Sequence, residues 1–274
     1  MIFFSEQPGF NINKKYHIEV DVDNTAMKID QDDIDTNDSL RAVKWMIDIL
    51  PNPRINETAP AIFFAVHNQN IDVLKWFFEH GAKIVNTADG SSLFNCAVRI
   101  KSDPKWLNLF LNYGIHETDM FGQNAFHWAA YQNRSTAVFD WLYEHEIDIN
   151  LENEDEETPF YIAVRFNPHA EILSWFLNQK NFDDFPIDFY FYVALMYNKE
   201  PKILQWFLNN GVDIELIDEE GNTWLHDAAQ NSEHFENVKW LIDQGVDINI
   251  KNNKGKTAQY YANKRKDWKN KGIF

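Results

Sequence analysis

GNTWLHDAAQNSEHFENVKWLIDQGVDIN, residues 221–249, contains two short apolar segments separated by a polar turn. The first segment carries the alanine pair Ala228 and Ala229, and the second is centred on Trp240. Gly245 follows the second segment, and the stretch ends in Asp-Ile-Asn, which also occurs at residues 148–150. Recurrence of this kind indicates an internal repeat, and a repeat decides the fold.

An alanine inside a short apolar segment recurs along the chain at intervals of 31 to 34 residues. These marker alanines are Ala65, Ala97, Ala129, Ala163, Ala194, Ala228 and Ala262. In all copies but the last, a second apolar segment follows the marker. Each complete copy therefore predicts two helices of roughly nine residues, which are too short to be stable alone and must pack on their neighbours.

Turn residues bound the two predicted helices of each copy. Threonine, as in the segments TPF and TWL, suits the start of the first helix, and in one copy Pro159 follows the threonine at a position that also suits a helix start. A glycine follows the second helix, where a left-handed cap favours a residue without a side chain. These glycines are Gly81, Gly114, Gly211 and Gly245. An extended loop then turns back toward the next copy and ends at Gly90, Gly122, Gly221 or Gly255.

The repeat resembles the ankyrin repeat, whose consensus is D-x-x-G-x-T-P-L-H-x-A-A, an apolar helix and G-A-D-V-N. The matching residues in the quoted copy are Gly221, Thr223, Leu225, His226, Ala228, Ala229, Gly245, Asp247 and Asn249. The resemblance implies an all-α ankyrin-repeat solenoid of helix-turn-helix units with finger hairpin loops. It also implies that His127 and His226 hydrogen-bond the backbone of the neighbouring loop.

The resemblance covers about 200 of the 274 residues and suggests three parts. Residues 1–57 would form an N-terminal cap with a half repeat and a small β-hairpin, residues 58–262 the repeat array, and residues 263–274 a basic tail or cap. The copy around Ala194 departs from the pattern because Phe189 replaces threonine and no finger glycine follows. The shape of the finger near residues 180–190 is therefore left open.

A tryptophan occupies one position of the second helix in six copies, where the family usually has leucine. These residues are Trp45, Trp76, Trp141, Trp175, Trp206 and Trp240, and Trp106 lies one turn upstream of this register. We interpret the rings as filling the space between adjacent second helices, in preference to a binding role.

Charge is distributed unevenly along the chain. The net charge is −17, although residues 251–271 carry eight Lys and Arg against the single acid Asp267. An acidic body repels nucleic acid and favours a basic partner, although simple solubility is the alternative. We expect a monomer that binds a protein, without nucleic acid, membrane or cofactor. The basic tail is expected to cap the array, and a nuclear or nucleic-acid tail is the alternative.

Composition indicates the compartment. A single cysteine, Cys96, excludes an intrachain disulfide, and there is no signal-like N-terminus or apolar run long enough to span a membrane. We expect a cytoplasmic protein, or one delivered into a host cytosol.

Two surface regions are the candidate partner-binding sites. The exposed side of the first helices and the apolar tip of one finger would contribute Met120, Phe121, Tyr131, Arg165, Phe166, Met196 and Tyr197. Two acidic fingers would contribute Glu152, Glu154, Asp155, Glu156, Glu157, Asp218, Glu219 and Glu220. A solvated acidic face and partly buried rings are the structural alternatives.

Enzyme chemistry has one candidate motif. Asp21 and Asp23, in a D-x-D-N-T context, resemble the nucleophile motif of haloacid-dehalogenase-type phosphatases, which needs Mg²⁺ and a parallel sheet. Too few residues precede the repeats for such a domain. As a calcium loop, the same stretch lacks the central glycine and has Asp32 where glutamate is preferred. The histidines show no metal-ligand spacing, so we expect neither catalytic nor metal residues.

The leading functional hypothesis is a non-catalytic module that binds a basic protein partner. It would act as an effector or scaffold of an intracellular microbe or large virus, or as an inhibitor or immunity-type protein. A third reading makes the chain a substrate, because Asn150 and Asn249 resemble the ankyrin asparagines that an oxygenase hydroxylates in animal cells.

Overall fold

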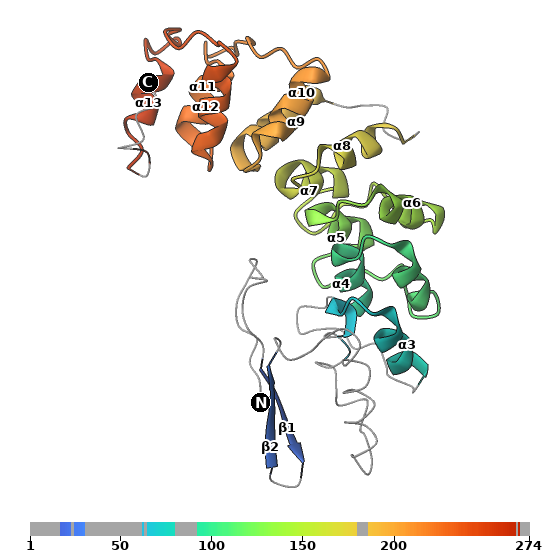
Figure 1. Cartoon of the computed structure of the whole chain (residues 1–274). Helices are drawn as coiled ribbons and strands as arrows, with labels where there is room; N and C mark the ends of the chain where they lie inside the picture. The colour runs from blue at the N-terminus through green and yellow to red at the C-terminus, as the bar shows by residue number, and fades with distance from the viewer. Residues whose placement is uncertain are drawn as a thin grey trace. The chain divides into compact units, whose positions relative to one another are not determined.

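The computed structural model describes residues 17–22, 25–30, 62, 65–79, 92–179, 186–266 and 268. The chain forms two compact units, Met1–Ile84 and Val85–Phe274, and each is described by itself. Figure 1 shows the elements of both units in chain order. Trp45, Asp23, Gly81, Gly90 and the finger at residues 180–185 lie outside the described residues.

The first unit contains the predicted hairpin and one second helix. Strands β1 (His17–Val22) and β2 (Thr25–Asp30) pair antiparallel, with Val22 opposite Thr25. The sequence of β1, HIEVDV, has the alternation of apolar and polar residues that suits a strand. Helix α3 (Ile71–Glu79) buries an apolar side that includes Trp76. Residues 65–67, around the marker Ala65, are also helical.

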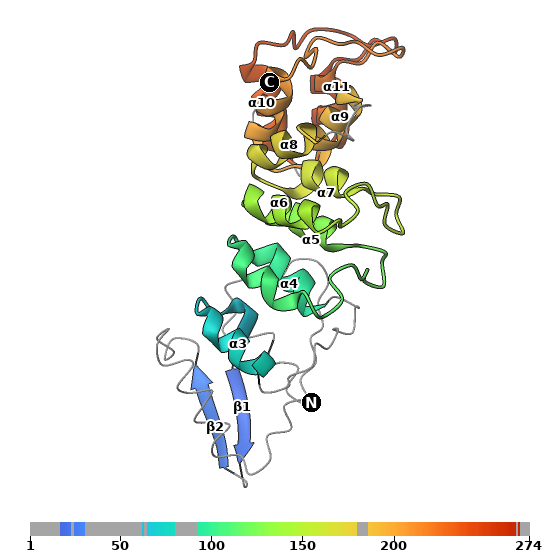
Figure 2. The same ribbon diagram turned by 90° about the vertical axis from the view of Figure 1, so that its right-hand side faces the viewer.

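The second unit is a succession of helix pairs. Its first helices, in the part of the chain described, are α4 (Leu93–Ile100), α5 (Ala125–Gln132), α7 (Pro159–Phe166), α9 (Ile187–Tyr197), α11 (Trp224–Asn231) and α13 (Ala258–Ala262). The second helices are η3 (Pro104–Phe110), α6 (Thr136–Glu144), α8 (Ala170–Leu177), α10 (Pro201–Asn209) and α12 (Phe235–Asp243). First helices contact first helices of the adjacent pair, and second helices contact second helices. In Figure 2 the connecting loops project away from the helices of this unit on one side.

Local sequence explains where these helices begin and end. Ser92, Asn124 and Thr158 cap first helices by accepting hydrogen bonds from backbone amides of the first turn. After the second helices, Gly114, Gly211 and Gly245 adopt positive φ angles, as the predicted left-handed cap requires. Two helices differ from the prediction. The segment that begins at Pro104 is a 3-10 helix, and α9 extends to 11 residues.

The core lies between the helix layers and depends on small and aromatic side chains. Six marker alanines are fully buried, and the seventh, Ala262, is almost so. Their small side chains let neighbouring first helices approach closely. Between the layers, Phe126 lies 6.1 Å from Phe139 and 5.9 Å from Trp175, measured between ring centroids. The repeat pattern read from the sequence therefore corresponds to the packing.

Of the five shared tryptophans that the structure describes, four are buried, as the structural interpretation predicts, and three of these also make polar contacts between repeats. Trp141, Trp175 and Trp206 are 6 %, 7 % and 9 % exposed. Each indole N–H donates to a side chain of the preceding second helix, on Asn108 at 2.8 Å, Asp140 at 2.7 Å and Ser174 at 2.7 Å respectively. Leucine could not make this bond. Trp240 is only half-buried.

Candidate protein-binding surface

The fingers are short loops closed by an aspartate or asparagine. In the described fingers this residue is Asp119, Asn153, Asp218 or Asn252, and its backbone N–H donates to the carbonyl of the residue four positions on. Its side chain accepts the backbone N–H of that same residue, at 2.7 to 3.1 Å. The first position of the family consensus, the aspartate of D-x-x-G, is this residue, so the sequence contains the signal for this contact.

Successive fingers are joined through backbone and histidine contacts. Glu154 N–H donates to Phe121 O at 2.9 Å. His127 Nδ1 accepts the Asn124 backbone N–H, so Nε2 carries the proton and donates to Glu157 O at 3.0 Å. Burial lowers the pKa of His127 to about 4, so the ring is neutral at neutral pH. His226 donates to Lys256 O in the same way, at 3.0 Å. The role that the family resemblance implies for both histidines is confirmed.

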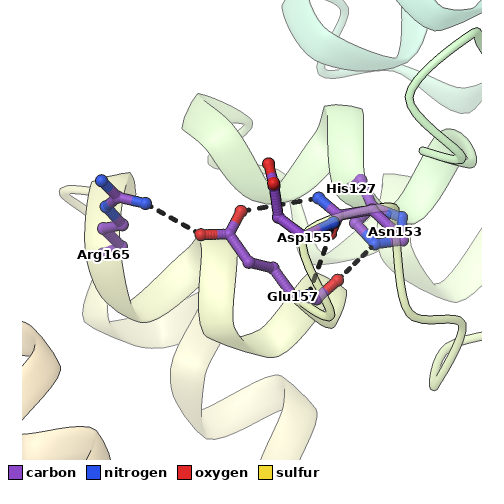
Figure 3. A network of polar contacts seen from close by, with 5 residues as sticks. All are labelled: His127, Asn153, Asp155, Glu157 and Arg165. Atoms are coloured by element: carbon purple, nitrogen blue, oxygen red, sulfur yellow. Dashed lines mark hydrogen bonds and ion pairs between the residues drawn. The ribbon is translucent and has the colours of Figure 1, made fainter.

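The acidic finger that follows α6 carries exposed carboxylates on Glu152, Glu154, Asp155 and Glu156. Glu157 differs from them, because Arg165 of α7 donates to its carboxylate at 2.8 Å (Figure 3). The prediction that Glu157 belongs to the exposed tip is therefore wrong. Its side chain turns toward α7 and is only 17 % exposed. Among the described residues, Glu154, Asp155 and Glu156 of this tip make no ion pair.

Two glutamates of this repeat occupy positions where other repeats have glycine. Glu156 has a φ angle of 59° at the position of Gly122 and Gly221, and Glu146 has a φ angle of 57° at the position of Gly114 and Gly211. A residue with a side chain pays a steric penalty of about 1 to 2 kcal/mol in this conformation. The repeat thus holds two extra negative charges at a cost in stability.

Replacing Glu156 with glycine is expected to raise the free energy of unfolding by about 0.5 to 1 kcal/mol. Glycine relieves the strain of the positive φ angle, and this gain exceeds the cost of the larger backbone entropy that glycine has in the unfolded chain. Urea denaturation measures the change. Glu156→Ala removes the same charge but keeps the strain. If alanine stabilises as much as glycine, charge repulsion at the tip and not backbone conformation is responsible.

An aromatic and arginine strip follows the first helices from α5 to α9. We define the strip as Trp128, Tyr131, Arg165, Phe166 and Tyr197. The rings of Tyr131 and Phe166 lie 5.2 Å apart, and the Arg165 guanidinium lies 4.8 Å from the Phe166 centroid and 4.7 Å from that of Tyr197. Phe166 is 40 % exposed, whereas Tyr131, Arg165 and Tyr197 are half-buried. The structure therefore brings four predicted residues, Tyr131, Arg165, Phe166 and Tyr197, together on adjacent repeats. It adds Trp128, which was not predicted and whose ring centroid lies 6.2 Å from that of Tyr131.

Met196 does not belong to this surface. It is 1 % exposed, so the prediction of an exposed residue two positions after the marker alanine is wrong here. Met196 O also accepts the backbone N–H of Glu233 at 2.8 Å, which covers this end of α9. By contrast, Met120 and Phe121 at the preceding fingertip are 57 % and 43 % exposed, as expected.

A second acidic finger comprises Asp218, Glu219 and Glu220, all exposed. Asp218 is partly used within its own loop, because it accepts the Asn222 backbone N–H at 2.7 Å. On the adjacent helix α11, burial and the charges of Asp218 and Glu220 raise the pKa of Asp227 to about 6. A partner cation near this half-buried carboxylate would relieve that repulsion.

The alternative hypotheses, a phosphatase and a substrate of an asparagine hydroxylase, depend on Asp21 and on Asn150 and Asn249. Asp21 lies in a two-stranded antiparallel sheet and not in the parallel sheet that the phosphatase motif needs. Asn150 and Asn249 are exposed after α6 and α12. Over the described ranges, no cluster of three or more His, Cys, Asp or Glu side chains could hold a metal ion, and no helix is long and apolar enough to cross a membrane.

A ladder of buried asparagines was missed. Asn133, Asn167 and Asn198 each follow a first helix, and each side-chain amide donates to two backbone carbonyls of the preceding repeat. Asn237 does the same from α12. The signal was available, because three of these residues stand four positions after a marker alanine.

Comparison with known proteins agrees with this architecture. The family model described as ankyrin repeats (3 copies) matches residues 94–185 and again residues 191–268, which is more than half of the chain. The chain belongs to the ankyrin-repeat family. Ankyrin repeats indicate a protein–protein interaction module.

Solved structures show the same fold. The ankyrin repeat domain of human ASB11 is 22 % identical, with a TM-score of 0.51, over 72 % of this chain and 89 % of that one. The ankyrin repeat domain of Bcl-3 is 21 % identical, with a TM-score of 0.43, over 72 % and 91 % of the two chains. A search of curated protein sequences found no match.

Proposed function

We propose that this chain binds a protein partner with a basic surface through the strip and the two acidic fingers. The observation that carries the proposal is the fingertip at Glu154, Asp155 and Glu156. These three exposed carboxylates have no ion pair among the described residues. The backbone N–H of Glu154 donates to Phe121 O, which joins this finger to the one that exposes Met120 and Phe121. Apolar anchors beside unpaired charge of one sign suit a partner of the opposite charge.

The strip would supply the apolar part of the contact. Phe166 presents an exposed ring that is supported by Tyr131 and Arg165, so its orientation is held before the partner binds. Aromatic residues and arginine are the usual hot spots of protein interfaces. The raised pKa of Asp227 supports a cationic group of the partner near the second acidic finger.

The biological setting that we propose is the cytosol, with the chain acting as an effector or scaffold or as an inhibitor of a basic protein. The two roles differ in their genetic context. An inhibitor is expected to be encoded beside the basic protein that it blocks, whereas an effector is expected to bind a protein of another cell.

The test is affinity purification of a partner with the full chain, followed by calorimetry on the purified pair. Reversal of Glu154, Asp155 and Glu156 to lysine is expected to weaken binding by about tenfold or more, and binding of the unaltered chain is expected to weaken with added salt. Phe166→Ala is expected to weaken binding without changing the salt dependence.

The matched control reverses three exposed acids on second helices, Glu144, Glu236 and Asp243. It changes the net charge equally but leaves the fingertip intact. Equal losses in the two triple variants would show that only overall charge matters. Unchanged binding in the fingertip variant and in Phe166→Ala would refute the proposed surface.

A further inference from the structure

The last repeat carries a charge opposite to that of the fingers before it. Residues 250–266 contain six Lys and Arg and no Asp or Glu, within a chain of net charge −17. Two of these residues, Lys256 and Lys264, contact the ring of Tyr260 of helix α13, and Lys254 lies two positions before Lys256 in the same finger. We call Lys254, Lys256, Lys264 and Tyr260 the basic end surface. The surface comes from two elements, since Lys254 and Lys256 lie in the last described finger and Lys264 follows α13.

Tyr260 holds two of the ammonium groups together. Lys256 Nζ lies 4.3 Å and Lys264 Nζ 4.5 Å from the centroid of its ring, which is 37 % exposed. Each contact is a cation–π interaction, and the shared ring keeps two like charges close to each other. No ion pair joins Lys254, Lys256 or Lys264 to a carboxylate in the part of the chain described. Among the described residues, the positive charge of this surface therefore has no paired carboxylate.

The nearby lysine charges change the pKa of the Tyr260 phenol. Its hydrogen bond to Lys264 and the charges of Lys264 and Lys256 lower the pKa of Tyr260. A neighbouring anion is therefore favoured at this place.

Arg265 has a different, structural role. Its Nη1 donates to Ser232 O, and its guanidinium lies 3.8 Å from the centroid of the buried Trp268 ring. Asn133, Asn167, Asn198 and Asn237 make the corresponding bond in earlier repeats. Arg265 thus extends the asparagine ladder, and we do not count it in the basic end surface.

The basic end surface adjoins the second acidic finger. Asn253 N–H donates to Glu220 O at 2.9 Å, and the Asn253 side chain donates to Glu219 O at 2.9 Å. The sign of the surface charge therefore reverses between two fingers in direct contact. A partner that covers both fingers must reverse its own charge over the same short distance.

We propose that the basic end surface binds an acidic protein segment, and that this segment belongs to the same partner whose basic surface contacts the acidic fingers. That the segment belongs to the same partner rests on the proposed function, whereas the binding of an acidic segment to the basic end surface does not. Nucleic acid fits less well, because an extended phosphate backbone that leaves the lysines would meet Glu219 and Glu220. A protein segment can place its acids only where the lysines are.

The first test uses fluorescence anisotropy of the full chain with a fluorescein-labelled acidic peptide of glutamate and glycine, at physiological salt. The triple variant Lys254→Glu, Lys256→Glu and Lys264→Glu is expected to weaken peptide binding by about tenfold or more. The matched control reverses Lys199, Lys202 and Lys239, three exposed lysines elsewhere, and is expected to change binding less than about twofold. Circular dichroism checks that each variant is folded.

A second pair of variants tests the role of the ring as a positioning residue. Tyr260→Phe keeps the ring under both ammonium groups and is expected to bind the peptide nearly as well as the unaltered chain. Tyr260→Ala keeps all the charges but releases the lysines, so its affinity is expected to fall. Equal affinity of the two variants would show that the ring does not organise the surface.

Other outcomes separate this proposal from its rivals and from the proposed function. Tighter binding of a labelled single-stranded oligonucleotide of equal length would identify nucleic acid, and not an acidic protein segment, as the ligand of the basic end surface. Equal loss in both lysine triple variants, or no peptide binding in the unaltered chain, would overturn the proposal. The fingertip variant is expected to retain peptide binding, so failure of the acidic fingers to bind a basic partner would leave this result unaffected.

Discussion

Replacing Asn167 with alanine is expected to lower the free energy of unfolding by about 3 kcal/mol. Asn167 is fully buried, and its side-chain amide donates to Ala130 O at 3.0 Å and to Asn133 O at 3.1 Å. Its side-chain oxygen accepts the His169 backbone N–H at 2.9 Å. Alanine would leave these backbone groups unpaired in the interior, at the boundary between two repeats.

Urea denaturation followed by circular dichroism measures this effect. The control is Asn178→Ala, because Asn178 is exposed after α8 and its side chain makes no hydrogen bond to any described residue. Since each repeat contacts only its neighbours, the variant is also expected to unfold less cooperatively than the parent. A loss no larger than that of the control would show that the ladder does not stabilise the array.

Replacing Trp175 with alanine is expected to cost about 3 to 5 kcal/mol. The indole is 7 % exposed and lies 5.2 Å from Phe139 and 5.3 Å from Phe176, measured between ring centroids. The substitution would open a cavity between α6 and α8 and would also remove the hydrogen bond to Asp140.

Trp175→Phe separates the two contributions. It keeps most of the aromatic packing but loses the bond to Asp140, so its expected cost is about 1 to 2 kcal/mol. Thermal and urea denaturation of both variants give the comparison. If phenylalanine costs as much as alanine, the hydrogen bond to Asp140 and not the filling of space explains why a tryptophan stands here.

The sequence predicted the structure correctly at positions where local steric fit allows only one type of residue. Buried marker alanines and left-handed glycines such as Gly211 and Gly245 were read correctly because steric fit decides both. The expectation that the residue two positions after a marker alanine is exposed failed where the side chain could pack against several different neighbours. Met196 occupies the same repeat position as Arg165, yet it is buried, whereas Arg165 extends to Glu157. Spacing along one helix does not reveal that choice.

Part of the candidate surface was also predictable. The exposed fingertip at Met120 and Phe121 and the acids at Glu154, Asp155 and Glu156 are where loop position and polarity place them. The ring contacts of the strip were not, because Tyr131 and Phe166 are 35 positions apart and meet only when α5 and α7 pack.

The sequence by itself determined the repeat, the two-helix unit and the positions of its caps, because these depend on local steric fit and on the period of apolar residues. Only the tertiary structure decided which polar groups face the interior and which remain unpaired at the surface. The hydrogen-bond acceptors of Asn167 and Trp175 lie on another repeat. Glu157 pairs with Arg165, whereas Glu154 makes no ion pair among the described residues. Hydrogen bonds and ion pairs depend on distances between residues far apart in the chain, and folding sets those distances.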